Sequence, residues 1–487
     1  MSCARFAMTA AAGEEETAMP LDATTLALAS LRELGAAIRG GETSPTALAK
    51  HFLERLDTVG RRFNAVVTLT PDRAMREARR AEEELAAGHD RGPLHGIPYG
   101  LKDLVATANI ATTFGAVPFK NQIFAQDATV ARRLDAAGAV LVAKLAMVEL
   151  AGGMGYDQPD ASLTGPGLSP WNPDAWSGGS SSGSGSAVGA RAVPFAIGSE
   201  TWGSIVTPSS FCGVTGLRPT YGRVSRHGAM ALCWTMDKLG PICRSADDCG
   251  LVLDAIAGPD PEDETSIDWP YRYAPEALRR DGLRLAVLPQ AADSMQPEVA
   301  ANFEAALGVL RELGSIEEVT LPEAPYDAVA ITIIRAEASS SFDDLLLAGR
   351  ANELTAPEDR INPLAYAALP ARDYLRALRI RRQIQRELDA LLSRFDAIVA
   401  PGIRTVAGPI HESFSKSLRR AAGDGLGAAG NLAGLPAVCV PNGFGERGLP
   451  TSIQFVCRAG AENAVLAVAN AYQQRTDWHR RLPPGAV

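Results

Sequence analysis

The chain has 487 residues, of which 46% are hydrophobic and 21% are charged, and its formal net charge is −9. This composition is ordinary for a globular protein, and the absence of a basic surplus argues against nucleic acid as a partner. The sequence has no uninterrupted run of about eighteen apolar residues, so we expect neither a transmembrane helix nor a membrane partner.

The first 22 residues contain Glu14-Glu15-Glu16 and no apolar segment, so they do not resemble a secretory signal. We expect residues 1–22 to be a disordered extension and residues 23–487 to form a single domain. The seven cysteines include no Cys-x-x-Cys pair, which predicts free thiols, no zinc site and a cytoplasmic location.

The first part of the domain alternates between helical and strand patterns. Leucines at helical spacing predict a helix over 24–39, and Ser44-Pro45 predicts the start of another that ends near 57. Further along we expect a strand at 64–69, a surface helix at 72–87, a helix capped by Asp127 at 127–137 and a buried strand at 139–143. This alternation predicts an α/β fold.

The second part of the domain continues the alternation around a variable region. We expect strands at 283–288, 395–400 and within 431–442, and helices at 297–313, 370–394 and 461–476. The variable region, about 320–425, is expected to face the substrate.

Two loops rich in glycine and serine, within 176–204, carry the strongest chemical signal. Glycine lets backbone approach a ligand closely, and a serine hydroxyl can attack a carbonyl or relay a proton. A flexible linker is excluded, because the apolar segments 187–197 and 205–214 must be buried. Lys102 lies in an apolar segment upstream and can act as a base if burial holds it neutral.

Two other serine motifs compete with this interpretation. The segment 179–183 matches the Gly-x-Ser-x-Gly elbow of α/β-hydrolases, which would require a downstream histidine such as His411 or His479. In a loop this rich in glycine and serine, that match is expected by chance. Ser413 and Lys416 match the Ser-x-x-Lys of penicillin-binding enzymes, but the accompanying Lys-Thr-Gly is absent.

The chain from about residue 25 to residue 483 resembles the amidase signature family, and three segments, 96–144, 171–250 and 426–456, match its motifs most densely and in order. The resemblance implies a large twisted mixed β-sheet sandwiched between helices. It also implies hydrolysis of amide bonds with no metal and no cofactor.

The same resemblance implies a catalytic triad of Lys102, Ser180 and Ser204. Ser204 would be the nucleophile and Lys102 the base, with Ser180 relaying the proton after a cis bond to Gly179. The N–H groups of the turn that ends at Ser204 would form the oxyanion hole. These N–H groups belong to Thr201, Trp202, Gly203 and Ser204.

Three positions depart from the family pattern. Ser182 and Trp202 stand where glycine is usual, and residues 205–208 lack a common arginine. The Trp202 ring either lines the acyl pocket or packs into the core, and the sequence leaves both open. We name Gly179, Ser181 and Trp202 as candidate pocket residues.

These features favour a free-standing amidohydrolase, a monomer or homodimer, with a small-molecule substrate as its partner. It would cleave hydrophobic or aryl amides, and also esters and carbamates (urethanes), through an acyl-Ser204 intermediate. The alternative is the A-type subunit of a glutamine-dependent tRNA amidotransferase, which works only with partner chains. Segments 219–226 and 336–341 resemble that subfamily, whereas Trp202, the missing arginine and the acidic charge count against it.

Overall fold

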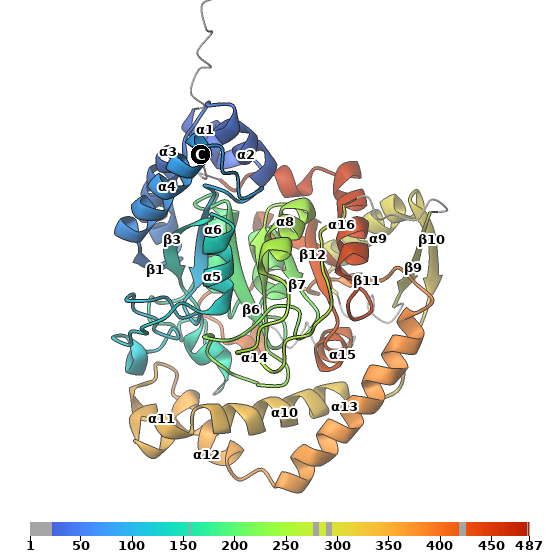
Figure 1. Ribbon diagram of the computed structural model, residues 1–487. Coiled ribbons are helices and arrows are strands. Elements are labelled where there is room, and N and C mark those ends of the chain that lie inside the picture. Colours follow the sequence, from blue (N-terminus) through green and yellow to red (C-terminus); the bar gives the residue numbers. More distant parts are fainter. Residues whose placement is uncertain are drawn as a thin grey trace, which may run out of the picture.

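A mixed β-sheet of eleven strands forms the centre of the protein, in the order β1-β3-β2-β6-β8-β7-β12-β13-β11-β9-β10. Its architecture comes from a computed structural model that describes residues 22–153, 155, 157–275, 282–288, 295–417, 425–484 and 486. The predicted N-terminal extension therefore lies outside the described residues, apart from Asp22. Figure 1 shows the helices gathered around this sheet.

The strands and helices have the following bounds. The strands are β1 Val66–Leu69, β2 Pro98–Lys102, β3 Val140–Leu145, β4 Leu168–Ser169, β5 Asn172–Trp176, β6 Phe195–Glu200, β7 Thr215–Arg218, β8 Lys238–Cys243, β9 Leu283–Val287, β10 Gly314–Glu318, β11 Ala397–Pro401, β12 Ala437–Phe444 and β13 Pro450–Val456. The helices are α1 Ala23–Leu28, α2 Leu31–Arg39, α3 Pro45–Arg55, α4 Pro71–Ala86, α5 Thr129–Ala136, α6 Ser182–Gly189, α7 Val206–Cys212, α8 Ala246–Ile256, α9 Pro297–Arg311, α10 Tyr326–Ser341, α11 Asp343–Leu347, α12 Asn362–Tyr366, α13 Ala371–Leu392, α14 Phe414–Ser417, α15 Leu426–Ala433 and α16 Glu462–Arg475.

Both faces of the sheet are buried under helices. Successive side chains of a strand point to opposite faces, and β6 follows this rule. Ala196 packs into a core with residues of α6 and α7, whereas Phe195 and Ile197 pack into a larger core with α8 and α16. The Phe195 ring stacks on Tyr99 of β2, with ring centroids 5.4 Å apart. The predicted α/β sandwich is confirmed.

The helix predicted over 24–39 is two helices, α1 and α2, which meet at Ser30. The Ser30 hydroxyl accepts a hydrogen bond from the Glu33 N–H, and the Glu33 carboxylate accepts one from the Ser30 N–H. This reciprocal capping box satisfies two backbone donors at the start of α2. Leucine periodicity alone did not reveal the break, because both helices bury leucines on the same side.

The expectation that Asp127 caps a helix is wrong. Helix α5 begins at Thr129, and Ala128 occupies the capping position without a side-chain bond. The Asp127 carboxylate instead accepts two hydrogen bonds of 2.8 Å from Arg73 and one of 2.7 Å from the Ala108 N–H. Asp127 therefore ties helix α4 to the loop that follows β2.

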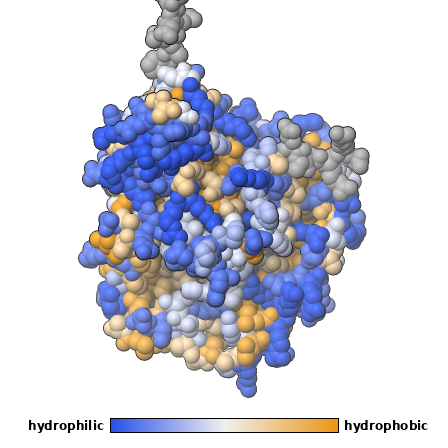
Figure 2. Space-filling view, in the orientation of Figure 1, coloured by the Kyte–Doolittle hydropathy of each residue, from blue (hydrophilic) through white to orange (hydrophobic). Residues whose placement is uncertain are grey.

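Helices α10 to α13 form an arm along the lower edge of the molecule in Figure 1. The arm carries exposed apolar side chains, among them Leu347, Ile361 and Leu364, which are 68–78% exposed. Figure 2 shows hydrophobic surface at this lower edge. No helix in the described part of the chain is long and apolar enough to cross a membrane.

We expect Ser30→Ala to lower the free energy of unfolding by about 1 kcal/mol, because it removes the cap of α2. Urea denaturation followed by circular dichroism measures the change. The matched control is Ser393→Ala, an exposed serine at the C-terminal end of α13 that caps no helix N-terminus. An equal effect of the two substitutions would contradict the capping role.

Candidate functional site

The candidate site lies where two neighbouring parallel strands end. Strands β2 and β6 pair in parallel, so their carboxyl ends lie at the same edge of the sheet. Lys102 is the last residue of β2, and Ser199 is the residue before the end of β6. Ser180 and Ser181 immediately precede α6, which packs against both strands. Four separate polar side chains are thereby brought together in the interior.

Three serine hydroxyls surround the amine of Lys102, which is fully buried. Its Nζ lies 2.7 Å from Ser180 Oγ, 3.0 Å from Ser181 Oγ and 2.9 Å from Ser199 Oγ. The Ser181 hydroxyl donates to the Ser199 carbonyl at 3.1 Å, so it accepts from Lys102. A neutral amine has two N–H donors and one lone pair, so it can interact with all three hydroxyls. It would donate to Ser181 and to one of Ser180 and Ser199, and its lone pair would accept a hydrogen bond from the other.

The surroundings of Lys102 favour the neutral amine. Burial lowers the pKa of Lys102 well below its usual value, and the distant carboxylates of Asp237 and Glu200 oppose this only in part. The adjacent carboxylate does not compensate, because Asp103 pairs with another buried lysine, Lys144, at 2.9 Å. Among the described residues, Lys102 thus has hydroxyl partners and no ion pair.

A buried carboxylate supports the turn that carries Ser204. Glu200 accepts hydrogen bonds from the N–H groups of Ile205 (2.8 Å) and Val206 (3.0 Å), the two residues after Ser204. Its other oxygen pairs with Arg218 at 2.9 Å. Burial opposes ionisation of Glu200, but Arg218 and Lys238 outweigh it and lower the pKa to about 2. The turn therefore rests on a permanent negative charge.

The N–H groups of residues 201–204 donate no hydrogen bond to any residue that the structure describes. Gly203 has φ +85°, a conformation that a residue with a side chain rarely adopts. The turn can therefore offer unoccupied donors to a ligand oxygen. Ser204 is 7% exposed, and its hydroxyl has no hydrogen bond to Ser180 or to any other described residue. The Gly179–Ser180 bond is cis, as the resemblance implied.

A cavity of about 190 Å³ opens beside Ser199 and Thr201. Its wall is the loop 226–232 together with Trp234, Asp237 and residues 262–263, and apolar side chains of Leu104, Ala151 and Leu239 complete it. None of the candidate pocket residues Gly179, Ser181 and Trp202 lines this cavity.

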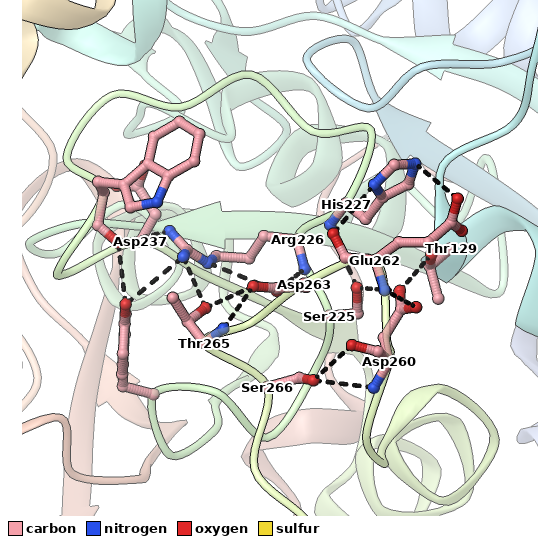
Figure 3. A network of polar contacts seen from close by, with 12 residues as sticks. Thr129, Ser225, Arg226, His227, Asp237, Asp260, Glu262, Asp263, Thr265 and Ser266 are labelled. Atoms are coloured by element: carbon pink, nitrogen blue, oxygen red, sulfur yellow. Dashed lines mark hydrogen bonds and ion pairs between the residues drawn. The ribbon is translucent and has the colours of Figure 1, made fainter.

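Arg226 fixes the polar side of the cavity (Figure 3). Its guanidinium donates to the Trp234 carbonyl and to Thr265 Oγ1, each at 2.7 Å, and it lies over the rings of Tyr221 and Trp234. Its backbone N–H donates to Asp263 at 2.7 Å. One arginine therefore joins the loop 221–237 to the acidic loop around Asp263.

The helical arm holds the same cavity wall from the other side. Glu337 of α10 accepts hydrogen bonds of 2.8 Å from both the N–H and the hydroxyl of Thr235. Arg381 of α13 donates to the Thr235 carbonyl at 2.6 Å. The position of the loop around Trp234 thus depends on contacts with the arm.

The Trp202 ring packs at the edge of the larger core. It lies beside Gly427 of α15, where an added methyl group would come within 3.3 Å of the indole nitrogen. The ring is partly buried against this core, and it does not line the cavity beside Ser199.

The competing serine motifs are not assembled into sites. Lys416 is exposed on α14, outside the buried cluster around Lys102. His411 is also exposed, and no histidine that the structure describes hydrogen-bonds to Lys102, Ser180 or Ser204. In the described part of the chain, no group of three or more His, Cys, Asp or Glu side chains could hold a metal ion.

Three site residues were missed by sequence reasoning: Ser199, Lys144 and Asp237. Ser199 precedes the acidic residue of the second loop, and its position at a strand end was a usable signal. Lys144 pairs with Asp103, and Asp237 accepts the Thr201 hydroxyl at 2.5 Å. Both pairs join distant segments, so no local pattern reveals them.

Comparison with known proteins agrees with the geometry. The amidase family model matches residues 47–466. The chain is 37% identical to the A-type subunit of glutamyl-tRNA(Gln) amidotransferase from Moorella thermoacetica, over 93% of this chain and 97% of that protein. It is also 37% identical to the same type of subunit from Geobacillus kaustophilus, over 93% and 98%.

Solved structures of the same kind have the same fold. Peptide amidase from Stenotrophomonas maltophilia superposes with a TM-score of 0.81 at 32% identity, covering 93% of this chain and 98% of that chain. The A-type subunit of glutamyl-tRNA(Gln) amidotransferase from Thermotoga maritima superposes with a TM-score of 0.77 at 27% identity, covering 96% and 98%.

These findings correct two expectations. The prediction of a free-standing hydrolase of aryl amides, esters or carbamates is wrong, because the curated relatives over nearly the whole chain are amidotransferase subunits. It rested in part on Trp202 as an aromatic pocket wall, and Trp202 does not line the cavity beside Ser199. The prediction of a small molecule as the only partner is wrong for the same reason, since those relatives are subunits of an enzyme named for glutamyl-tRNA(Gln). Net charge is a sum over the chain and does not report a local interface.

Replacing either of the two buried lysines is expected to change the free energy of unfolding, but for a different reason at each position. The unfolded chain binds a proton at Lys102 that the folded chain releases, so the stability of the wild type relative to Lys102→Met should rise with pH toward the usual lysine pKa of 10.5. Lys144→Met should instead lose about 3–5 kcal/mol near neutral pH, because it leaves the buried Asp103 without a partner.

Urea denaturation of the three proteins at several pH values measures both effects. A difference between the wild type and Lys102→Met that does not change with pH would mean that Lys102 is charged in the folded protein.

Proposed function

Because the chain belongs to the amidase family, we propose that it is the amide-cleaving subunit of a glutamine-dependent amidotransferase that acts on glutamyl-tRNA(Gln). The observation that carries the proposal is the 37% identity to subunits of that enzyme, which extends over 93% of this chain and 97–98% of theirs. The assembled lysine and serines support it with a chemistry that cleaves carboxamides.

The proposed reaction begins with attack by Ser204 Oγ on the carboxamide carbon of glutamine. The serine proton passes through the Ser180 hydroxyl to the neutral amine of Lys102. The same path returns the proton to the leaving nitrogen, so ammonia departs and a glutamyl ester remains on Ser204. Water then attacks the ester and gives its proton to the relay, which returns it to Ser204 Oγ as glutamate is released. The ammonia displaces the activating group of the activated glutamyl-tRNA(Gln).

The turn at 201–204 supports the proposal through its unoccupied N–H groups. A negative oxygen develops on the substrate carbonyl during both attacks, and each well-placed donor lowers the barrier by about 3–4 kcal/mol. The carboxylate of Glu200 is directed to the following N–H groups of Ile205 and Val206, which leaves the first four for the substrate.

The cavity beside Ser199 supports an amino-acid substrate. Its wall carries groups of both signs, with Arg226 next to Glu262 and Asp263. Glutamine has an ammonium and a carboxylate at one end and an uncharged carboxamide at the other, so a cavity of mixed charge beside a neutral amine suits it.

The exposed apolar side chains of the arm support the proposed association with partner chains. A large contiguous patch of exposed apolar side chains commonly marks a site where another protein binds. Leu347, Ile361 and Leu364 lie on neighbouring elements of this arm.

The function is tested by purifying the chain alone and together with the partner subunits of an amidotransferase from the same organism. We expect ammonia release from glutamine, and amidation of glutamyl-tRNA(Gln), only from the assembled complex. The complex with Ser204→Ala is the control and should assemble without either activity. Glutamine turnover by the chain alone, at the rate of the complex, would contradict the proposal.

The role of Lys102 predicts the pH dependence of that activity. The protonated amine cannot accept a proton, so glutamine cleavage should fall as the pH drops through the lowered pKa of Lys102. Lys102→Met should reduce kcat about 10²–10⁴-fold or more.

Ser199→Ala separates the base from its surroundings. It removes one acceptor that stabilises the protonated amine, so the acidic limb of the pH profile should move to lower pH while activity at its plateau persists. Steady-state kinetics of the complex across pH measures both variants. An unchanged acidic limb in Ser199→Ala would show that the limb belongs to another group.

A further inference from the structure

A second polar cavity, of about 640 Å³, lies at the opposite end of the central strands from Ser204. It is enclosed by α2, α8 and α16, which gather toward the top of the molecule in Figure 1. Arg191 precedes β6 and Arg244 follows β8, its antiparallel neighbour, whereas Ser199 lies near the other end of β6. A six-residue strand is about 20 Å long, so the two cavities are separated by the thickness of the domain.

Two buried arginines line this second cavity without an acidic partner. Arg191 is 3% exposed and Arg244 is 7% exposed, and neither forms an ion pair with a described carboxylate. The Nε and one terminal nitrogen of Arg191 have no hydrogen-bond partner among the described residues, and neither has the Nε of Arg244. The remaining contacts of Arg191 are to the carbonyls of His479 and Arg481. Buried guanidinium groups normally have all their donors occupied, so these unpartnered donors point to a group that the described residues do not supply.

Burial disfavours the charge of both arginines, and Arg244 adds to this effect at Arg191. Burial, together with the nearby Arg244, lowers the pKa of Arg191 to about 9. Burial also lowers the pKa of Arg244, opposed by Asp248 and Glu33. A bound anion would offset this effect, whereas nothing in the described protein does so fully.

The acidic residues of the cavity do not cancel its arginines. Asp247 is taken up by Arg32, which donates to it through two nitrogens at 2.5 and 2.9 Å. Asp248 and Glu33 remain, and burial raises the pKa of Asp248, which disfavours its charged form. Against these two carboxylates stand three arginines, since the exposed Arg480 lies at the rim.

His479 contributes no positive charge at neutral pH. Burial, with help from Arg480 and Arg191, lowers its pKa to about 4. Its Nδ1 is buried without a partner in the described part of the chain. Ser245, Asn470 and Gln474 add uncharged polar groups to the wall.

We propose that this cavity, with Arg191 and Arg244 at its floor and Arg480 at its rim, is a binding site for a small multivalent oxyanion, of the phosphate or polycarboxylate class. Guanidinium groups bind the oxygens of both classes through paired hydrogen bonds. The volume is in the range of sites that hold small metabolites. The site is separate from the proposed glutamine site and does not depend on it.

The test is isothermal titration calorimetry of the full-length protein with sodium pyrophosphate and, separately, with citrate, at constant ionic strength. We expect saturable binding of at least one of them, and the stronger of the two identifies the class. Arg244→Gln should weaken that binding about tenfold or more, because it removes a charge-assisted contact. The matched control is Arg372→Gln, an arginine whose side chain is 86% exposed on α13, and it should bind as the wild type does.

Two further variants keep the result decisive. Ser204→Ala should bind the anion with wild-type affinity, since the site is at the other end of the strands. If Arg244→Gln does not fold, Arg480→Gln at the exposed rim takes its place with a smaller expected loss. The proposal is overturned if neither anion gives saturable heat, or if the folded arginine variant binds as tightly as the wild type.

Discussion

The buried ion pair between Glu200 and Arg218 is the interaction on which the candidate site depends. Glu200 ends β6, Arg218 ends β7, and Asn431 of α15 donates to the same carboxylate at 3.1 Å. A charge in the interior is retained only where its lone pairs are occupied, and here the other oxygen accepts the backbone N–H groups of the two residues that follow Ser204. The position of Ser204 is thus set by a cation on another strand.

Lys102 and Asp103 are adjacent in the chain, but their side chains have different partners in the interior. Asp103 and Lys144 form an ion pair that ties the end of β2 to β3, whereas Lys102 lies among hydroxyls and burial lowers its pKa. Had Asp103 faced Lys102, the amine would hold its proton at neutral pH and could not act as a base. The chemistry of the site therefore depends on which of two buried lysines the carboxylate meets.

The sequence was informative where the signal is local. The apolar setting of Lys102 and the serine-proline start of α3 are readable within a few residues, and they were predicted correctly. The first glycine-serine segment was expected to be a loop, whereas helix α6 begins within it at Ser182. The contact of Ser199 with Lys102 requires that β2 and β6 pair in parallel, and this pairing joins residues 97 positions apart. Asp127 misled for a related reason: its partner, Arg73, lies on another helix.

The substrate was the weakest part of the sequence-based interpretation. A single side chain, Trp202, carried the argument for an aryl pocket, and residue type alone does not say which way a ring turns. The ring lies next to Gly427, far along the chain, where the missing side chain leaves room for it. Sequence identity over the whole chain, in contrast, combines information from several hundred positions, and it identified the amidotransferase subunits as relatives.

The contacts between the arm and the loop at Thr235 have a consequence for how this protein can diversify. The groups proposed to react come from β2, α6 and the turn after β6, whereas the cavity wall comes from the loop 221–237 and is held by Glu337 and Arg381. Recombination that exchanges the arm together with its loop would therefore replace this cavity wall and leave the groups proposed to react in place.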